Sequence, residues 1–291
     1  MEIKVEKITK RYNSSVVALK ENSFVIPNGL FGLIGRNGAG KTTFLRILAT
    51  AMEATGGSIY YDGVEQREDI KGLRKKIGYL PQNTKLMPHL NLVEFLDYMA
   101  VLKGINDEKQ RKGEVNRCIS LVGLEEHKKK RLSGYSGGML RRAGIAQALL
   151  GDPELLIVDE PTTGLDPEER IYFINVLSKL ALTKTLVLST HITADVENIC
   201  DNVAILEEGV IQYCGDIDAL IESLRGRTWG VKVSIDREEE LKEKLLVTRC
   251  SVQKRKLLVR YIAEQSMVEN SELVEPVLED AYVHILGGVK R

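Results

Sequence analysis

The sequence predicts an α/β fold built around a parallel β-sheet that is covered by helices. Three short and almost wholly apolar runs, which are typical of strands inside such a sheet, occupy Leu30–Ile34, Leu155–Val158 and Thr185–Ser189. A helical pattern from Pro167 to about Leu182 lies between the second and third runs. The order strand, helix, strand indicates a parallel crossover, because parallel strands need a long connection between them.

The N-terminal residues have a different pattern. Apolar and polar residues alternate over residues 1–30, and Pro27-Asn28-Gly29 marks a turn. We therefore expect short antiparallel strands there. A further strand and turn are expected at Ile59–Gly63, and a buried strand at Ile77–Leu80 that Pro81 stops.

The middle of the chain changes to helical spacing. Apolar residues recur every three or four positions between residues 83 and 150, so we expect a helical subdomain with charged outer faces. A boundary is expected near Gly226, which gives a large domain over residues 1–225 and a small α+β region over residues 226–291. In that region we expect strands at Trp229–Ile235 and Lys256–Ile262, a charged helix at Arg237–Leu246, and a last helix from Pro276 to Leu286 that Gly287-Gly288 closes.

Charge argues against nucleic acid as a partner. The 291 residues carry 41 Lys and Arg against 41 Asp and Glu, so the net charge is +0 and no global field favours a polyanion. The basic run Lys128–Arg131 follows Glu125 and Glu126, and we interpret it as a solvated helix face.

The cysteines and the hydropathy of the sequence indicate in which compartment of the cell the protein is expected. The four cysteines form no CxxC pair and have no histidine at zinc-ligand spacing, which favours reduced thiols in a cytosolic protein. The charged N-terminus lacks the apolar segment of a signal peptide, and no apolar run reaches about 18 residues. We expect no membrane span, so a role at a membrane would require a partner.

A glycine-rich loop carries the strongest chemical signal. It follows the strand at Leu30–Ile34, precedes a helix expected at Thr42–Ala51, and fits the pattern GxxxxGK[ST]. Its amides would wrap phosphates, Lys41 would hold the β- and γ-phosphates, and Thr42 would bind Mg²⁺. The alternative, a glycine-rich turn without a ligand, does not explain the full motif in this context. The expected ATP-binding residues of the loop are Gly35, Arg36, Asn37, Gly38, Ala39, Gly40, Lys41, Thr42 and Thr43.

Two carboxylates follow the apolar run at Leu155–Val158. Ligands of open parallel sheets bind at the carboxyl ends of the strands, so Asp159 is placed to support Mg²⁺, partly through water. Glu160 could polarise an attacking water molecule. An Asp-Glu pair is also common on ordinary surfaces, but a P-loop in the same chain favours the catalytic interpretation.

The motifs and their order resemble the ATP-binding subunits of ABC (ATP-binding cassette) transporters over residues 1–220. The resemblance implies a P-loop NTPase core of ABC type with an antiparallel β subdomain, a helical subdomain and a small C-terminal α+β appendage. The matching segments are Gly35–Thr43 (Walker A), Leu155–Glu160 (Walker B), Tyr135–Met139 (signature), Tyr79–Gln82 (Q-loop), Thr163–Asp166 (D-loop), Ser189–His191 (switch histidine) and Lys10–Tyr12 (adenine-stacking aromatic).

The resemblance implies the remaining site residues. Tyr12 would stack on adenine, Gln82 would reach Mg²⁺ and the water, and His191 would contact the γ-phosphate, although an exposed loop tyrosine and a polar strand-end histidine also have ordinary structural explanations. Asp166 would communicate between two ATP sites. The signature residues Ser136, Gly137 and Gly138 would close over the ATP of a second subunit, so the chain would act as a dimer, most simply a homodimer.

Two residues depart from the family pattern at the signature. Tyr135 replaces the usual Leu and Met139 the usual Gln, while the phosphate-facing Ser136–Gly138 are intact. We expect ATP-driven closure to survive. The resemblance implies an ATPase, with ATP and Mg²⁺ as cofactors, that powers an integral membrane permease from the cytoplasmic face.

Local segments of the sequence indicate the subfamily, and the number of cassettes and the net charge bear on the alternative function. Segments Asn91–Leu96, Met139–Arg142 and Glu275–Asp280 resemble bacterial exporters of drugs, antibiotics or peptides. The alternative is a non-transport ABC ATPase, regulatory or translation-associated. Such translation factors usually carry two cassettes and basic nucleic-acid contacts, whereas this chain has one cassette and no net charge.

Overall fold

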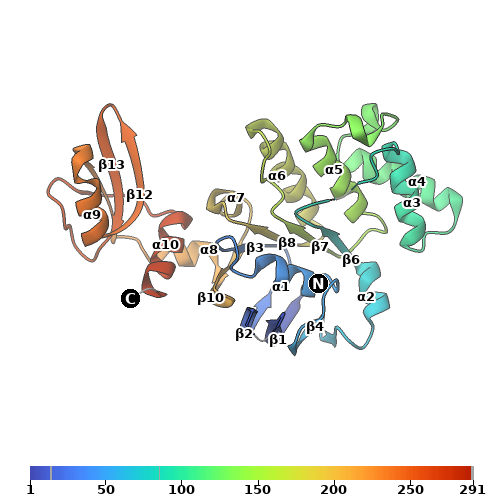
Figure 1. Ribbon diagram of the computed structural model, residues 1–291, viewed down its shortest axis with the longest axis horizontal. Helices are drawn as coiled ribbons and strands as arrows, with labels where there is room; N and C mark the ends of the chain where they lie inside the picture. Colours follow the sequence, from blue (N-terminus) through green and yellow to red (C-terminus); the bar gives the residue numbers. More distant parts are fainter. Residues whose placement is uncertain (14, 85, 290–291) are drawn as a thin grey trace.

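A six-stranded sheet forms the centre of the larger part of the molecule (Figure 1). The computed structural model describes residues 1–13, 15–84 and 86–289. The strand order is β10-β9-β3-β8-β7-β6; all neighbouring pairs are parallel except β9 with β10. This confirms the expected α/β fold. The strands are β3 (Leu30–Ile34), β6 (Ile77–Leu80), β7 (Leu155–Asp159), β8 (Thr185–Thr190), β9 (Asn202–Glu207) and β10 (Val210–Asp216).

A second, antiparallel sheet lies beneath the first and confirms the expected β subdomain. Its order is β2-β1-β4-β5, and helix α1 lies between the two sheets (Figure 1). Apolar residues of β1, α1 and β3 share one buried cluster, which fixes α1 against both sheets. The elements are β1 (Ile3–Arg11), β2 (Val17–Ile26), α1 (Lys41–Leu48), β4 (Gly56–Tyr61) and β5 (Val64–Glu65).

Helices cover the other side of the six-stranded sheet and form the expected helical subdomain. Asn91 starts α3 with a reciprocal capping box to Glu94, and Asp107 caps α4. α5 packs against β6 so closely that a Cβ on Gly144 would lie 2.7 Å from Leu80 Cδ1. The subdomain helices are α3 (Leu92–Leu102), α4 (Glu108–Leu121) and α5 (Gly137–Ala148). Helices α6 (Pro167–Ala181), α7 (Thr193–Glu197) and α8 (Ile217–Glu222) pack on the same side, whereas α2 (Ile70–Lys76) places Leu73 in the buried cluster of α1.

The residues after α8 build a separate antiparallel sheet, called here the C-terminal sheet. Its order is β12-β13-β11-β14, and α9 covers a small core of its own around Val259 and Tyr261. Apart from its first residue, strand β12 occupies residues to which the sequence analysis assigns no element. The elements are β11 (Thr228–Val233), α9 (Glu238–Lys244), β12 (Leu246–Gln253), β13 (Lys256–Ile262) and β14 (Glu272–Leu273).

The last helix, α10 (Leu278–Val289), returns from the C-terminal sheet to the cassette. The prediction that Gly287-Gly288 closes this helix is wrong, because α10 continues through both glycines. A Cβ on Gly287 would lie 2.6 Å from Leu246 Cδ1, so glycine there permits close packing of the helix on β12. α10 also packs on α7 and α8, and its Leu278 and Ala281 are buried in the main cassette core.

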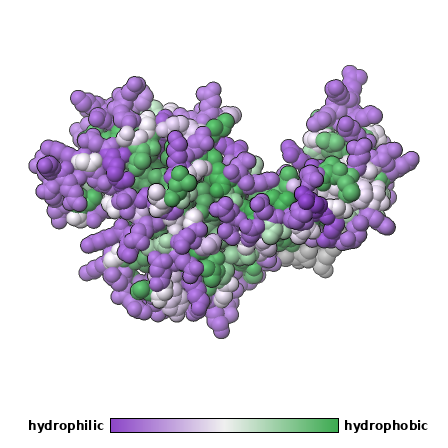
Figure 2. Space-filling model, turned by 180° about the vertical axis from the view of Figure 1, so that it is seen from behind, coloured by the Kyte–Doolittle hydropathy of each residue, from purple (hydrophilic) through white to green (hydrophobic). Residues whose placement is uncertain are grey.

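The surface is mostly hydrophilic. Figure 2 shows apolar surface running through the narrow waist that joins the two parts, where α8 and α10 lie. Among the described residues, no helix is both long and apolar enough to cross a bilayer.

Candidate functional site

The glycine-rich loop is shaped by its surroundings. Gly35 lies against the backbone, because a Cβ there would be 2.4 Å from the carbonyl oxygen of Leu206. Gly40 has a φ of 110° and would place a Cβ 2.6 Å from the carbonyl oxygen of Ala18. A side chain at either position would force the loop open. The loop therefore keeps its backbone turned around the start of α1, where amide groups favour an anion.

Lys41 is held inside the loop. Its side chain is buried, and Nζ donates to the carbonyl oxygens of Gly35 at 2.7 Å and of Arg36 at 3.2 Å. Nζ also lies 3.1 Å from Glu160 Oε1, which places the expected phosphate ligand and the expected general base in one ion pair. These contacts fix the ammonium group at the mouth of the loop.

Glu160 has a strained backbone and a carboxylate with a charged neighbour on each side. Its φ of 48° lies in the left-handed region, which costs a non-glycine residue about 1 kcal/mol or more. Oε2 lies 2.8 Å from His191 Nδ1 and accepts a hydrogen bond from Thr163 Oγ1 at 3.0 Å. The carboxylate therefore lies between Lys41 and His191.

Asp159 has the environment of a metal-supporting carboxylate. It is fully buried at the end of β7, and its Oδ1 accepts a hydrogen bond from Ser189 Oγ at 2.6 Å. Its Oδ2 is buried without a hydrogen-bond partner among the described residues. An unpartnered buried carboxylate oxygen is costly, so this donor set fits a hydrated Mg²⁺ ion.

A cavity of about 330 Å³ lies over the loop. Its lining includes Gln82 and Glu160, so the structure brings three sequence-predicted motifs to one place. The hydroxyl of Tyr12 lies 3.1 Å from Thr43 Oγ1, which sets the aromatic ring beside the same helix start. The other lining residues are Ala18, Arg36, Asn37, Gly38, Gly40, Lys41, Thr42 and Thr43.

The signature segment does not line this cavity. Ser136 caps α5, because its Oγ accepts from the amide of Met139 at 3.2 Å. Tyr135, the departure from the family pattern, packs into the main core and donates its hydroxyl to the carbonyl oxygen of His127 at 2.9 Å. Tyr135 therefore keeps the core contact that an apolar leucine would make, and it adds a hydrogen bond next to Gly137-Gly138.

Asp166 has a capping role at the start of α6. Its Oδ1 accepts a hydrogen bond from the amide of Glu169 at 2.9 Å, and the residue is exposed. Glu169 in turn lies against the signature, since a Cβ on Gly138 would be 2.3 Å from its carboxyl carbon. The D-loop and the signature are therefore neighbours through one side chain.

The contacts of three residues near the site were not predicted, although all three stand in segments that the sequence analysis names. Thr163 and Ser189 hold the two carboxylates, and Arg141 donates to backbone carbonyls around them. Small hydroxyl residues after buried strands are the only signal for the first two. Arg141 stands beside Arg142, and such a pair resembles an ordinary solvated helix face.

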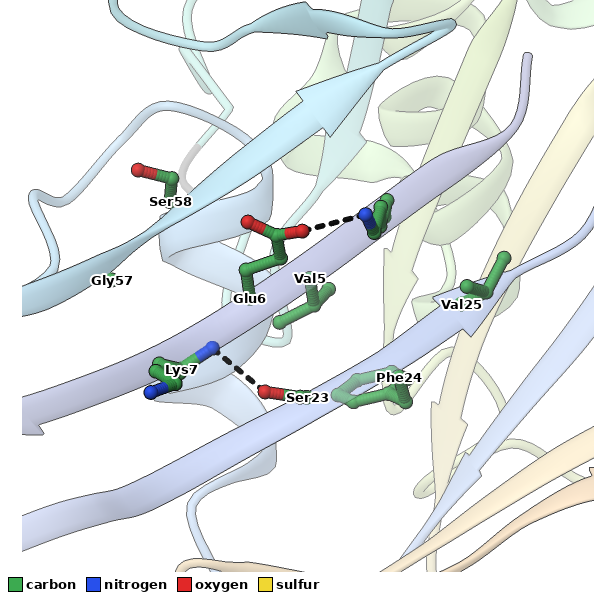
Figure 3. A pocket seen from close by; sticks show the side chains of 9 residues that line it. Val5, Glu6, Lys7, Ser23, Phe24, Val25, Gly57 and Ser58 are labelled. Carbon is green, nitrogen blue, oxygen red and sulfur yellow. Dashed lines mark hydrogen bonds and ion pairs between the residues drawn. The ribbon is translucent and has the colours of Figure 1, made fainter.

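A larger hollow lies elsewhere and lacks this chemistry. It measures about 530 Å³ and lies across β1, β2 and β4 (Figure 3). In it, Glu6 pairs with Lys4 at 2.6 Å, and the amide of Lys7 donates to Ser23 Oγ. Both charged groups of the ion pair are exposed, so the hollow presents a solvated surface rather than a binding site.

The fold and the site together define a P-loop nucleoside triphosphatase. Comparisons with known proteins identify the family within this class. The ABC transporter family model matches residues 19–163. The ABC transporter ATP-binding protein YxlF of Bacillus subtilis is 35% identical over 84% of this chain and 81% of its own length. The chain therefore belongs to the ATP-binding proteins of ABC transporters, and it is an ATPase.

Other relatives and solved structures agree with this membership. The bacitracin transport ATP-binding protein BcrA of Enterococcus faecalis is 36% identical over 71% of this chain and 67% of that protein. A Synechocystis ABC transporter ATP-binding protein, sll0415, is 39% identical, and the match covers 74% of this chain but 61% of the relative. The dimeric structure of MJ0796, a bacterial ABC transporter cassette, matches with a TM-score of 0.67 at 26% identity, over 74% of this chain and 98% of that one.

Proposed function

We propose that this chain powers a membrane exporter by closing with a second copy of itself around two ATP molecules. The observation that carries the proposal is the division of the site. Lys41, Glu160 and Gln82 line one cavity, whereas the signature begins a helix outside it. A head-to-tail C₂ dimer completes both sites, because each copy then supplies its signature to the other. The dimeric MJ0796 cassette supports this arrangement.

The residues of the cavity have distinct proposed roles. The loop amides and Lys41 bind the β- and γ-phosphates, and Tyr12 stacks on the base. Glu160 takes the proton from the attacking water, and His191, 2.8 Å from that carboxylate, holds the γ-phosphate. Before ATP binds, Lys41 pairs with Glu160 and is occupied. ATP then competes for Lys41 and frees the carboxylate for the water.

Magnesium fits the same place. Thr42, Asp159 and Gln82 would hold it, the first directly and the others partly through water. When bound, the ion neutralises charge on the β- and γ-phosphates.

The proposed partner is an integral membrane permease, and the chain sits at the cytoplasmic face of the membrane through it. The relatives named for bacitracin transport and for linearmycin resistance support an exporter of drug-like or peptide cargo. The helical subdomain offers the receiving surface. This partner distinguishes the proposal from a non-transport ABC ATPase: gentle solubilisation should recover the chain with a multi-spanning protein in near-equal amount, and recovery with ribosomes or alone would contradict the transport role.

The closing step is tested with Glu160→Gln. The amide keeps the shape of the side chain but cannot accept the proton, so we expect ATP binding with loss of most hydrolysis and an ATP-dependent dimer in sedimentation velocity. Glu154→Gln is the matched control, because Glu154 forms an exposed pair with Lys76. A Glu160→Gln chain that remains monomeric at saturating Mg-ATP, with and without its permease, would contradict the composite site.

A further inference from the structure

We propose that Arg141 is a positioning residue that sets the geometry of the catalytic loop and ties it to the signature helix. The inference rests on the role proposed above for Glu160. Arg141 lies on α5, five residues after the cap Ser136, and its side chain is partly buried. It reaches two residues of the cavity lining, Gln82 and Glu160, through hydrogen bonds to their backbone carbonyl oxygens.

The guanidinium joins two separate loops. Nη2 donates to the carbonyl oxygen of Glu160 at 2.8 Å, and Nε donates to that of Pro161 at 3.1 Å. On its other edge, Nη1 donates to the carbonyl oxygens of Pro81 at 3.4 Å and of Gln82. The first two residues follow β7 and the last two follow β6, so one planar side chain holds the ends of two neighbouring strands together.

This contact holds the backbone at the point of strain. Glu160 adopts a φ of 48°, and its amide donates to Ser189 while its carbonyl accepts from Arg141. Both backbone groups of the strained residue are therefore fixed from opposite directions. The direction of the carboxylate toward Lys41 and His191 follows from that backbone.

Two opposing effects act on the charge of Arg141. Burial lowers the pKa of the Arg141 guanidinium, and the neighbouring carboxylates of Asp159 and Glu160 oppose that shift. A cation beside these carboxylates offsets their mutual repulsion and leaves the carboxylate oxygens accessible, because its hydrogen bonds within the described part of the chain are to carbonyl groups.

The placement also connects two ATP sites. Ser136 and Arg141 are separated by about 7 Å along the axis of one rigid helix. The N-terminus of α5 meets the partner's ATP in the proposed dimer, whereas Arg141 touches the loops of its own site. Movement of α5 on closure therefore changes the support of Glu160 and Gln82 directly.

The test is a kinetic double-mutant cycle in the full chain. Arg141→Met keeps the aliphatic stem and removes the five donors; Arg141→Lys keeps the charge but loses the fork. We expect Arg141→Met to lower kcat about 10- to 100-fold, as misplacement of a catalytic group by about 1 Å does, with ATP affinity unchanged within about twofold. Arg141→Lys should recover part of the loss. In the Glu160→Gln background, Arg141→Met should change the residual rate by less than about twofold, because the residue acts through Glu160.

The control is Arg117→Met. Arg117 also donates to a backbone carbonyl in the helical subdomain, that of Leu149 at 3.0 Å, but lies away from the cavity. It should leave kcat unchanged, and thermal unfolding checks that each variant is folded. An unchanged kcat in folded Arg141→Met, or an equal loss with and without Glu160, would overturn the inference. A Glu160→Gln chain that hydrolyses ATP normally would instead overturn the proposed role of Glu160.

Discussion

Replacing Asp280 with alanine should unfold the C-terminal sheet at a much lower urea concentration. Asp280 is buried at the start of α10, and its carboxylate connects this helix to β12 and β13. It accepts hydrogen bonds from Arg260 Nη2 at 2.6 Å, from the amide of Val277 at 3.0 Å and from the hydroxyl of Thr248. The alanine variant removes all of these acceptors at once.

The size of the effect follows from burial. Removing one member of a buried ion pair costs about 3–5 kcal/mol, because the other charge is left without compensation. The side chain of Arg260 is 21% exposed, and in the alanine variant it still has its hydrogen bond to the carbonyl oxygen of Glu275, at 2.8 Å. We therefore expect the lower end, about 3 kcal/mol. With an m-value of about 1.5 kcal/mol per M, the urea midpoint falls by about 2 M.

The chain carries its own probe for this transition. Its single tryptophan, Trp229, lies on β11 of the C-terminal sheet and donates its indole N–H to the carbonyl oxygen of Ala263. Tryptophan fluorescence therefore follows the C-terminal sheet, while binding of a fluorescent ATP analogue follows the cassette. The two signals separate a local loss from a global one.

A neighbouring residue supplies the control. Glu279 stands next to Asp280 on α10, but its contact with Arg249 is long, 3.9 Å, and exposed. Glu279→Ala should leave the fluorescence midpoint nearly unchanged. A shift of less than about 0.5 kcal/mol in Asp280→Ala, similar to that of Glu279→Ala, would refute the argument that the buried pair joins α10 to the sheet.

Three further predictions concern the site and the thiols. Tyr12→Ala should weaken ATP binding about tenfold in a fluorescence titration, as loss of base stacking does, whereas Tyr12→Phe should bind ATP nearly normally. Equal losses of affinity in the two variants would assign the effect to the contact of the hydroxyl with Thr43. Gly138→Ala should bind ATP but dimerise more weakly, because the added Cβ, 2.3 Å from the carboxyl carbon of Glu169, displaces that side chain beside the signature. A dimer in sedimentation as stable as that of the unaltered chain would contradict this. Burial raises the pKa of the Cys118 thiol to about 12, so its contribution to stability is complete below pH 9 and is lost as the pH rises toward 12. At pH 8, mass spectrometry should find Cys118 alkylated only after urea is added, and rapid alkylation of the native chain would contradict its burial.

The sequence was informative where one local pattern fixes both backbone and chemistry. The loop at Gly35–Thr42 needs its glycines for close approach and its lysine for charge, so its position between β3 and α1 could be predicted. The parallel strands were predictable because burial on both faces leaves apolar runs. The end of α10 could not be predicted, because the sequence does not distinguish a glycine that packs against Leu246 from a glycine that ends a helix.

Contacts between distant segments account for the rest. Nothing near Arg141 in the sequence indicates that it donates to loops after β6 and β7, since those loops meet it only in the folded sheet. The ion pair of Lys41 with Glu160 joins residues from separate motifs in the same way. Sequence motifs predict which groups belong to a site, but the resting connections among those groups depend on tertiary structure.

The return of α10 has a consequence for synthesis of the protein on the ribosome. Leu278, Ala281 and Leu286 belong to the same buried cluster as the cassette strands β3, β7 and β8. Domains usually fold in order as they emerge, from the N-terminus onward. Here the first domain cannot complete its core until α10 has left the exit tunnel. A chain shortened by a premature stop codon, even one late in the gene, would expose apolar surface on the cassette itself and become a target for proteases.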